Sequence, residues 1–480
     1  MGAHTVEKIG GTSISDTEAV LQNILIGPSE GAALYGRIFV VSAYAGMTDR
    51  LLDHKKTGQP GVYALFAAAS SRESGAWRAA LDEVAAAARA INAEKFADPQ
   101  DRTEADVFIE RRIRRAASCL ADLQRLCAHG HFRLDGQLGA VREMLASIGE
   151  AQSAFNLTLE LRRRGVSARM VDLTGWDEQD ALSLDQAIEA AFADIDLAAE
   201  LPIVTGYAKS QPGLLAEYGR GYTEVVFSRI AALTGGREAI IHKEFHLSSA
   251  DPKVVGEAAV RKIGRTNYDV ADQLANLGME AIHPRAAAGL RHAGIPLCVR
   301  NTFEPGDVGT TIWSDFVSET ARVEIIAGAT GVTALELFEQ DMVGVKGYDA
   351  GALAVLTRHA VRIVSKASNA NTITHYLDAN PKQIKRVIAD LERQFPNATL
   401  TTLPVALVCV IGSDLNIPGL TAKAAMALTE AGVEILGMQQ LTRRVDLQFV
   451  VHESDYSASV RALHARLVAA GDGAELRNAA

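Results

Sequence analysis

The sequence predicts an α/β protein: a mostly parallel sheet flanked by helices, followed by two smaller ferredoxin-like modules. Through residue 313, short apolar stretches of strand type alternate with stretches of helical spacing, which is typical of a parallel sheet. A turn of glycines and hydroxyl residues follows the first apolar stretch and suits anion binding. After residue 310 the order becomes strand, helix, strand, strand, helix, which is the ferredoxin-like pattern.

The strands of the parallel sheet are predicted within the first 300 residues, and a long helical insertion interrupts them. The strands are predicted at residues 5–9, 37–42, 168–173, 201–206, 239–242, 281–283 and 296–300. Residues 66–165 are rich in Ala, Glu and Arg at helical spacing, so we expect a helical insertion there. Its arginine pairs at 111–112 and 114–115 are interpreted as a solvated helix face.

The last third of the chain is expected to hold two related modules, at residues 320–395 and 399–470, after a catalytic domain at residues 1–315. In the second module we predict strands at 403–411, 434–440 and 445–452 and helices at 418–431 and 457–469. The first module has matching helices at 350–359 and 381–395. This similarity indicates internal duplication, in which the two modules could exchange a terminal strand.

The composition favours a globular protein and argues against nucleic-acid-binding and membrane-spanning proteins. The 480 residues are 48% apolar, enough for several hydrophobic cores. The net charge of −10 argues against nucleic acid as a partner, and the absence of a long apolar run argues against a membrane span. No signal peptide is recognised. The four cysteines lack zinc-type spacing, so a reduced, cytoplasmic protein is expected.

Residues 6–13, Val-Glu-Lys-Ile-Gly-Gly-Thr-Ser, suggest a phosphate site at the end of the first strand. Glycines let backbone amides approach an anion, and a helix start favours negative charge. A capping box at residues 15–18 would begin that helix. Lys8 precedes the glycines, unlike the lysine of a P-loop. The alternative is a plain glycine turn with an exposed Lys8.

The second strand runs into small and hydroxyl residues at 40–48. Open α/β sheets bind ligands beyond the carboxyl ends of their strands, so Ser42, Gly46 and Thr48 are candidates for polar contacts. The alternative is a turn in which Thr48 caps the next helix.

Two further candidates carry charge. Glu150 is expected near a helix start, where it would either satisfy the helix dipole or receive an ammonium group. Arg220 lies between two glycines and could clamp a carboxylate or phosphate, with Glu224 one turn into the following helix. A surface salt bridge is the alternative for Arg220.

Residues 242–253 follow another strand and are polar, turn-forming and cationic at both ends. The ribose and phosphates of a nucleotide could bind there. The two histidines of this segment lack metal-type spacing with acids, so no metal is expected.

Taken together, these motifs resemble the aspartate kinase family. The family's opening Lys-aromatic-Gly-Gly-Thr-Ser matches residues 8–13, and its Val-x-Ser-Ala-x-Ala-Gly-x-Thr matches residues 40–48. A Gly-Glu pair at 149–150, Ala-Asp-Pro at 250–252, His-Pro at 283–284 and Asn-Thr-Phe at 301–303 follow in family order. The paired C-terminal modules resemble regulatory ACT domains.

The resemblance implies an amino acid kinase fold and transfer of the ATP γ-phosphoryl group to the β-carboxylate of L-aspartate, with Mg²⁺ on the phosphates. It implies a homodimer or higher even oligomer through the ACT modules, and a possible amino-acid effector. No metal is assigned to protein side chains. The implied catalytic residues are Lys8, Arg220 and Glu224; the aspartate-binding residues are Ser42, Thr48, Glu150 and Arg220; the nucleotide-binding residues are Lys8, Gly10, Gly11, Thr12, Ser13, His242, Lys243, Ser248, Asp251 and Lys253.

The chain also departs from the family pattern. Glu224 stands where the family has Asp, Lys253 where it has Arg, and Glu280 where it has Lys. The altered block at 241–252 resembles a divergent subgroup that serves ectoine biosynthesis. Arg362 takes the place of an effector-binding Asp, so weak or absent inhibition by lysine is expected. The alternatives are another carboxylate-directed amino acid kinase and a catalytically weak amino-acid sensor.

Overall fold

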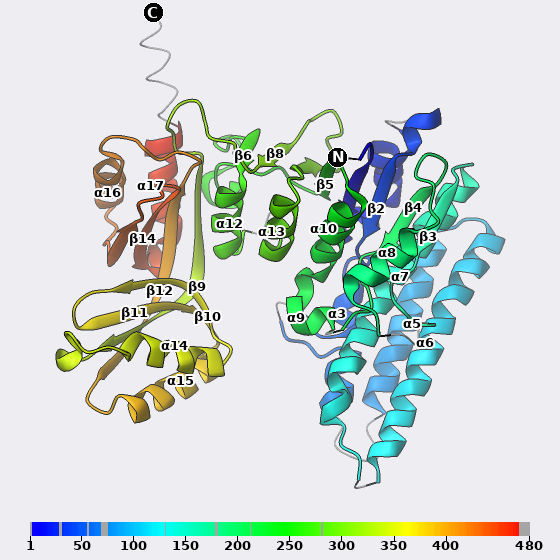
Figure 1. The fold of residues 1–480 in the computed structure, drawn as a ribbon, viewed down its shortest axis with the longest axis horizontal. Coiled ribbons are helices and arrows are strands. Elements are labelled where there is room, and N and C mark those ends of the chain that lie inside the picture. The colour runs from blue at the N-terminus through cyan, green and yellow to red at the C-terminus, as the bar shows by residue number, and fades with distance from the viewer. Residues whose placement is uncertain are drawn as a thin grey trace, which may run out of the picture. The chain divides into compact units, whose positions relative to one another are not determined.

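The computed structural model describes residues 2–27, 31–54, 57–68, 75–129, 131–177, 181–211, 213–279 and 282–469. The chain divides into two compact units (Figure 1). The first unit comprises Met1–His246 and Ile282–Ser314, and the second comprises Leu247–Ala281 and Asp315–Ala480. The predicted catalytic domain, residues 1–315, includes residues 247–281, whereas in the structure these residues belong to the second unit. They join the second unit because apolar side chains such as Leu247, Val270 and Leu274 share a core with Ile325 and Leu407.

The first unit is built on a sheet in the order β3-β4-β2-β1-β5-β7-β8. The strands are parallel except β8, which runs antiparallel to β7. The central strand β1 is buried at all five residues, as expected for a strand covered on both faces. The strand bounds are β1 Thr5–Ile9, β2 Arg37–Val41, β3 Ala168–Val171, β4 Leu201–Thr205, β5 Glu238–Lys243, β7 Leu297–Asn301 and β8 Thr310–Trp313.

The predicted α/β class is confirmed, and all but one of the predicted strands of this sheet lie within two residues of an observed strand. The exception is residues 281–283. Ala281 and Glu280 lie outside the described residues, and Ile282 and His283 are not in a strand. The reason is local: Pro284 occupies the first turn of helix α13 (Pro284–His292), and the His283 side chain caps that helix by accepting from the Arg285 amide.

Helices cover the first unit's sheet and form the long insertion. The helices α5, α6 and α7 contact one another in sequence order and appear as long neighbouring rods (Figure 1). The helical elements of this unit are α1 Gly11–Ser15, α2 Thr17–Val20, η1 Leu21–Leu25, η2 Gly31–Leu34, α3 Met47–Leu51, α4 Val62–Ala68, α5 Ala76–Lys95, α6 Pro99–Cys127, η3 Asp135–Gln137, α7 Leu138–Arg163, α8 Leu184–Phe192, α9 Leu214–Tyr218, η4 Gly219–Gly221, α10 Tyr222–Thr234 and α13.

Two local predictions in this unit are wrong. Helix α2 is capped by Asp16, whose side chain accepts from the Ala19 amide, instead of by Ser15. Arg112 is not part of a solvated face: it is buried, pairs with Asp172 and donates to Thr174 Oγ1 at 2.8 Å. Its positive charge therefore ties α6 to the segment after β3.

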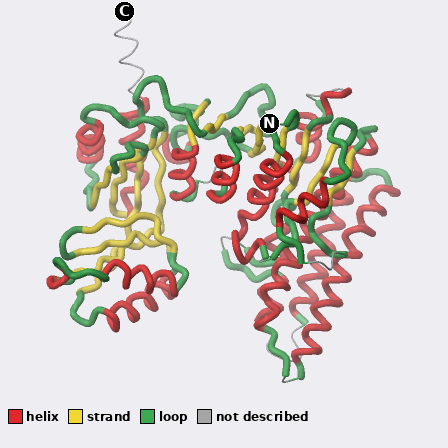
Figure 2. Tube along the Cα trace, in the orientation of Figure 1, coloured by secondary structure: helices red, strands yellow, loops and turns green. Residues whose placement is uncertain are grey.

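The second unit holds one six-stranded antiparallel sheet in the order β10-β11-β9-β12-β14-β13 (Figure 2). Its two long strands pair along their lengths, so that β9 lies beside β11 and β12, and β12 lies beside β9 and β14. The two modules therefore share one continuous sheet. The strand bounds of this sheet are β9 Ile325–Phe338, β10 Arg362–Ser368, β11 Thr372–Asp378, β12 Thr399–Ile411, β13 Gly437–Gln440 and β14 Asp446–His452. The short strand β6, Arg265–Asn267, also belongs to this unit but not to this sheet.

Each module buries its helices against its own half of that sheet. Leu335, Val355 and Leu391 belong to one core, whereas Val408, Leu428 and Leu463 belong to another. Among the described residues, no helix is both long and apolar enough to cross a bilayer. The helical elements of this unit are α11 Pro252–Val255, α12 Tyr268–Asn276, η5 Gln340–Met342, α14 Tyr348–Arg358, α15 Pro381–Gln394, α16 Leu420–Glu430, η6 Glu453–Asp455, α17 Tyr456–His464 and η7 Ala465–Ala469.

Candidate active site

Lys8 projects from the central strand β1 toward the start of helix α10. It is 9% exposed, and its Nζ lies 3.3 Å from Oε1 of Glu224. The other Glu224 oxygen accepts the backbone amide of His283. Burial raises the pKa of the Glu224 carboxyl, but the charges of Lys8 and Lys243 and the His283 amide outweigh burial, and the pKa lies below its ordinary value. The lysine is thus held in place by a carboxylate that stays ionised.

The predicted position of Glu150 near a helix start is wrong. Glu150 lies in the middle of α7. Its side chain is buried, and Oε1 accepts from the Thr223 hydroxyl at 2.7 Å. Oε2 is buried and has no hydrogen-bond partner among the described residues. Burial raises the pKa of the Glu150 carboxyl to about 8, and the hydroxyls of Thr223 and Tyr222 and the Lys8 charge offset burial only in part. This unpartnered oxygen is a ready acceptor for a ligand's ammonium group.

Two glycines let the backbone close around Glu150. A Cβ on Gly206 would lie 3.1 Å from Glu150 Oε2 and 2.8 Å from the Val41 carbonyl oxygen. A Cβ on Gly149 would lie 2.9 Å from the Ala43 Cβ. Both positions require the absence of a side chain, because contacts below about 3.0 Å force neighbouring atoms to move. The carboxylate therefore lies at the carboxyl ends of β2 and β4, where ligands of open sheets bind.

The segment after β2 is fixed by backbone hydrogen bonds. The Ser42 amide donates to the Ile9 carbonyl at 3.2 Å, and Ser153 Oγ donates to the Ser42 carbonyl at 2.8 Å. Thr48 is half-buried in α3. It is not the helix cap, because the N-cap of α3 is Gly46, at φ 78°. The structure thus places Ser42 beside the end of β1 and leaves the Thr48 side chain without a capping role.

The glycine turn after β1 is tight. A Cβ on Gly11 would lie 2.8 Å from the Ala43 carbonyl oxygen, so the turn can approach the loop after β2 only with glycine there. Ser13 is fully buried, and its hydroxyl accepts from Thr302 Oγ1 at 2.9 Å. Thr12 is exposed. Gly10, Gly11 and Thr12 therefore border the Lys8 end of the sheet, whereas the Ser13 side chain is engaged within the fold.

Arg220 occupies the short turn η4 between α9 and α10. Its guanidinium pairs with Asp49 and donates to the backbone oxygen of Asp53. The Arg220 side chain is 19% exposed, so this is a partly buried pair and not a surface salt bridge. Gly221 is required because a Cβ there would lie 2.2 Å from the His283 ring. The pair joins η4 to α3, which also carries Thr48.

His242 faces away from Lys8, and its position does not support the predicted nucleotide contact beside Lys8. Side chains alternate along strands. His242 Nε2 lies 2.8 Å from Glu7, which is the neighbour of Lys8 and projects to the opposite face. Arg37 pairs with the same carboxylate at 2.9 Å. Burial raises the pKa of Glu7, but His242 and Arg37 outweigh burial and hold the pKa well below its ordinary value. This network stabilises the sheet interior.

The remaining predicted nucleotide residues separate into two groups. Lys243 lies on the Lys8 face, where its charge acts on Glu224, and its ammonium lies 5.7 Å from the centre of the Phe245 ring. Ser248, Asp251 and Lys253 belong to the second unit. There Ser248 Oγ donates to the Ala250 carbonyl, and Asp251 caps α11 by accepting from the Lys253 amide at 2.9 Å.

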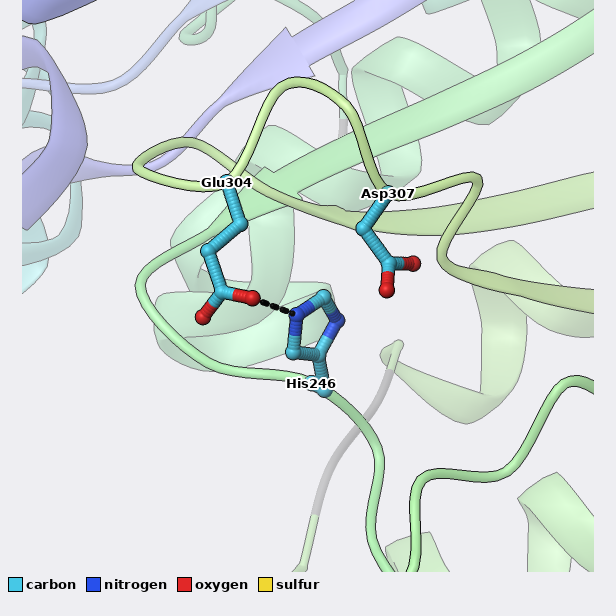
Figure 3. A group of neighbouring side chains, drawn as sticks. All are labelled: His246, Glu304 and Asp307. Atoms are coloured by element: carbon cyan, nitrogen blue, oxygen red, sulfur yellow. Dashed lines mark hydrogen bonds and ion pairs between the residues drawn. The ribbon is translucent and has the colours of Figure 1, made fainter.

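The structure groups His246, Glu304 and Asp307, which the sequence spacing did not suggest (Figure 3). One ligand atom of each lies within 4.8 Å of the others. His246 Nε2 lies 3.0 Å from Glu304, which also accepts from Asn301 at 3.0 Å. One imidazole and two carboxylates could hold a transition-metal ion, whereas Mg²⁺ prefers oxygen ligands. The ion pair with His246 and the hydrogen bond from the Asn301 side-chain amide account for the Glu304 contacts. We therefore assign no metal to the group.

Sequence reasoning missed Thr223, Asp49 and the His283 amide, which bind Glu150, Arg220 and Glu224 respectively. Thr223 carried a weak signal, because it directly precedes Glu224 in a motif already recognised. Asp49 is 171 positions from Arg220, and nothing in the local sequence marks the pair.

Comparison with known proteins identifies the family of the chain. A model of the amino acid kinase family matches residues 4–301. Aspartate kinase Ask_Ect of Stutzerimonas stutzeri is 53% identical over 465 residues, which cover 97% of each chain. The chain belongs to the aspartate kinase family. The aspartokinase of Schizosaccharomyces pombe is 25% identical over 364 residues, which cover 68% of this chain and 69% of that one.

Solved aspartate kinases share the fold. E. coli aspartokinase III in complex with aspartate and ADP superposes with a TM-score of 0.73 at 22% identity, over 97% of this chain and 99% of that one. The aspartate kinase of Clostridium acetobutylicum gives 0.68 at 17% identity, over 96% of this chain and all of that one. The predicted family, fold and enzyme class, a kinase acting on aspartate, are therefore confirmed.

Proposed function

We propose that this aspartate kinase transfers the γ-phosphoryl group of ATP to the β-carboxylate of L-aspartate, forming 4-phospho-L-aspartate for ectoine biosynthesis. The observation that carries the proposal is the buried, unpartnered Oε2 of Glu150 in the same site as Lys8. An amino acid whose ammonium pairs with Glu150 would direct its side-chain carboxylate into the region of the positive charge of Lys8.

Each residue then has one task. Glu150 binds the ammonium, and Arg220 binds the α-carboxylate through the N–H groups that its acidic partners leave available. Lys8, aligned by Glu224, stabilises negative charge on the transferring phosphoryl group. The Gly11 amide, at the start of α1, would approach the phosphates, whereas the Gly10 amide donates to the His242 carbonyl at 3.3 Å and shapes the turn. The acceptor needs no general base, because a carboxylate is already ionised at neutral pH.

Mg²⁺ would neutralise phosphate charge and is expected to arrive with ATP. Glu224 fits poorly as a metal ligand, because both its oxygens are engaged, by Lys8 and by the His283 amide. The protein side chains named here therefore bind the substrates, and Mg²⁺ binds the nucleotide phosphates.

The assignment to ectoine synthesis rests on the divergent block at residues 241–252 and on the 53% identity to Ask_Ect. We further propose a homodimer or higher even oligomer through the ACT-like modules, whose shared sheet ends in the edge strands β10 and β13. Amino-acid effectors would act through the same modules.

The activity is tested by incubating the purified protein with ATP, Mg²⁺ and hydroxylamine, which traps acyl phosphates. We expect hydroxamate with aspartate and none with glutamate or without substrate. Hydroxamate with glutamate would indicate a different amino acid kinase. No hydroxamate with any substrate would favour the sensor alternative.

A further inference from the structure

The two groups that the proposed function assigns to the ammonium and the α-carboxylate of aspartate come from different elements. Glu150 lies on α7, and Arg220 lies in η4, directly after the short helix α9. The ammonium and the α-carboxylate of an amino acid are attached to one carbon atom, so the separation of the groups that bind them must be set accurately. Contacts that hold α9 against α7 therefore affect the binding of the substrate.

Glu143, which is half-buried on α7, makes such a contact. Its Oε1 accepts from the Ala216 amide at 3.0 Å. Ala216 is in the first turn of α9, where backbone amides lack an acceptor within the helix, and the N-cap residue Gly213 has no side chain to supply one. Glu143 therefore caps α9 from a neighbouring helix and fixes the start of the segment that leads to Arg220.

The other oxygen of Glu143 binds a pair of aromatic residues next to Glu150. Oε2 accepts from the Tyr207 hydroxyl at 2.8 Å, and Tyr207 is 3% exposed. The Tyr207 ring packs edge to face against the ring of Tyr222, with the ring centres 5.6 Å apart. The Tyr222 hydroxyl is in turn hydrogen-bonded to the Glu150 carboxyl. One carboxylate is thus connected to both of the groups proposed to bind aspartate.

The contact between Glu143 and α9 depends on a glycine. A Cβ on Gly213 would lie 2.4 Å from Glu143 Oε1, so a side chain at this position would displace the carboxylate. The glycine therefore leaves space for Glu143 to reach the Ala216 amide.

We propose that Glu143 is a positioning residue for aspartate binding. Through Ala216 it holds the turn that carries Arg220, and through the tyrosine pair it supports Glu150, so it sets the separation of the two groups that bind the substrate. The inference rests on the proposed function, in which Arg220 binds the α-carboxylate and Glu150 binds the ammonium.

The test is the steady-state kinetics of Glu143→Ala, together with calorimetric titration of aspartate, which needs no turnover. We expect the aspartate KM and Kd to rise at least about tenfold, with kcat and the ATP KM within about twofold of wild type, because a misplaced binding group weakens the ground state and the transition state alike. Glu143→Gln should restore most of the affinity, since its amide oxygen can accept from Ala216 and its amide N–H can donate to the Tyr207 hydroxyl oxygen. Glu160→Ala is the matched control, because Glu160 lies on the same helix and pairs with Arg164 at 2.9 Å; its aspartate KM should be unchanged.

A double-mutant cycle with Arg220→Ala gives a readout that a purely stabilising role would not affect. If Glu143 acts by placing Arg220, adding Glu143→Ala to Arg220→Ala should lower kcat/KM for aspartate by less than about threefold. A further tenfold loss in the double variant would show that the two residues act independently, and would overturn the proposal.

The outcomes separate this inference from the proposed function. Absence of hydroxamate from wild type with aspartate would refute the function itself. Hydroxamate from wild type, with an unchanged aspartate KM in Glu143→Ala or an equal rise in its ATP KM, would refute the positioning role alone. If Glu143→Ala does not fold, Gly213→Ala decides, because it displaces Glu143 Oε1 without removing the carboxylate. Its aspartate KM should rise at least about threefold, and a KM like that of wild type would contradict the proposal.

Discussion

Two buried glutamates in the active site differ in the charge state that their surroundings favour. At Glu150, burial outweighs the hydrogen bonds from Thr223 and Tyr222 and the charge of Lys8, so its pKa rises to about 8. Glu224 is less completely buried, with 13% of its side chain exposed, and Lys8, Lys243 and the His283 amide lower its pKa. The Glu150 carboxyl therefore titrates near neutral pH, whereas the Glu224 carboxyl remains ionised there.

The difference separates two kinds of task. Glu150 gains most when a cation arrives, because a ligand's ammonium would supply the charge that its environment lacks. Glu224 already has its cations and serves to position Lys8. Pairs of carboxylates whose surroundings shift their pKa values in opposite directions are a recurring mark of active sites. Lys8 is the charged neighbour that Glu150 and Glu224 share. Replacing Lys8 or Glu150 tests whether the two carboxylates have these separate tasks.

The largest effect is expected for Lys8→Ala. Lys8 is the cation nearest Glu224 and the proposed contact to the transferring phosphoryl group. We expect kcat to fall by about 10²-fold or more with little change in the aspartate KM, because the charge is needed mainly in the transition state. Steady-state kinetics with coupled ADP detection measures this. Turnover like that of wild type would exclude Lys8 from the mechanism.

Glu150→Gln should affect binding more than turnover. The amide is similar in size but cannot neutralise an ammonium, so the aspartate KM should rise by about 10²-fold. The same change removes a buried carboxylate with an unpartnered oxygen, so the melting temperature should rise.

Glu160→Gln is the matched control for this change, because Glu160 lies on the same helix but pairs with Arg164 at 2.9 Å. It should leave the KM unchanged. An unaltered KM in Glu150→Gln would remove Glu150 from the aspartate site.

A dependence on pH follows from the same carboxyl. With a pKa of about 8 in the free enzyme, Glu150 is mostly protonated at pH 6.5 and ionised above pH 8. We expect kcat/KM for aspartate to rise about tenfold per pH unit below 8 and then to level off. Stability should move in the opposite direction: a carboxyl whose pKa is raised by folding loses stability as pH increases toward 8. Glu150→Gln should flatten both profiles.

Much of the fold could be predicted from the sequence because it is locally encoded. Buried parallel strands appear as short apolar runs, and this is why most predicted strands of the first unit agree with the observed ones. The prediction failed at residues 282–283, where a proline and a histidine cap favour a helix start over a strand. It also failed to group residues 247–281 with the second unit, because that grouping depends on long-range packing.

The site shows the same limit more sharply. Lys8 and Glu150 were found through motifs, but the position of Glu150 in mid-helix was not, since a helix start cannot be located from one Gly-Glu pair. His242 lay in a polar segment that suggested a nucleotide, yet strand alternation turns it to the other face. The pairing of Asp49 with Arg220 could not be predicted, because the two residues are 171 positions apart in the chain.

His242→Asn tests the contrast between the two faces of β1 and should have a modest effect. It removes one partner of a buried carboxylate, so the free energy of unfolding should fall by about 2 kcal/mol, measured by urea denaturation. The ATP KM should stay within about twofold of wild type, because His242 faces away from Lys8. A large rise in the ATP KM with unchanged stability would return His242 to the nucleotide site.

The smallest effect is expected from lysine. E. coli aspartokinase III has been crystallised with lysine and aspartate. In the present chain Arg362 is exposed on β10, pairs with Asp378 at 3.0 Å and donates to the Asn276 carbonyl at 2.6 Å. A lysine ammonium would meet a like charge at this position, whereas an aspartate there would attract it. We therefore expect millimolar lysine to change the initial rate by less than about twofold. Strong inhibition would show that the effector contacts lie elsewhere in the modules, and would weaken the link to a pathway in which lysine is not the end product.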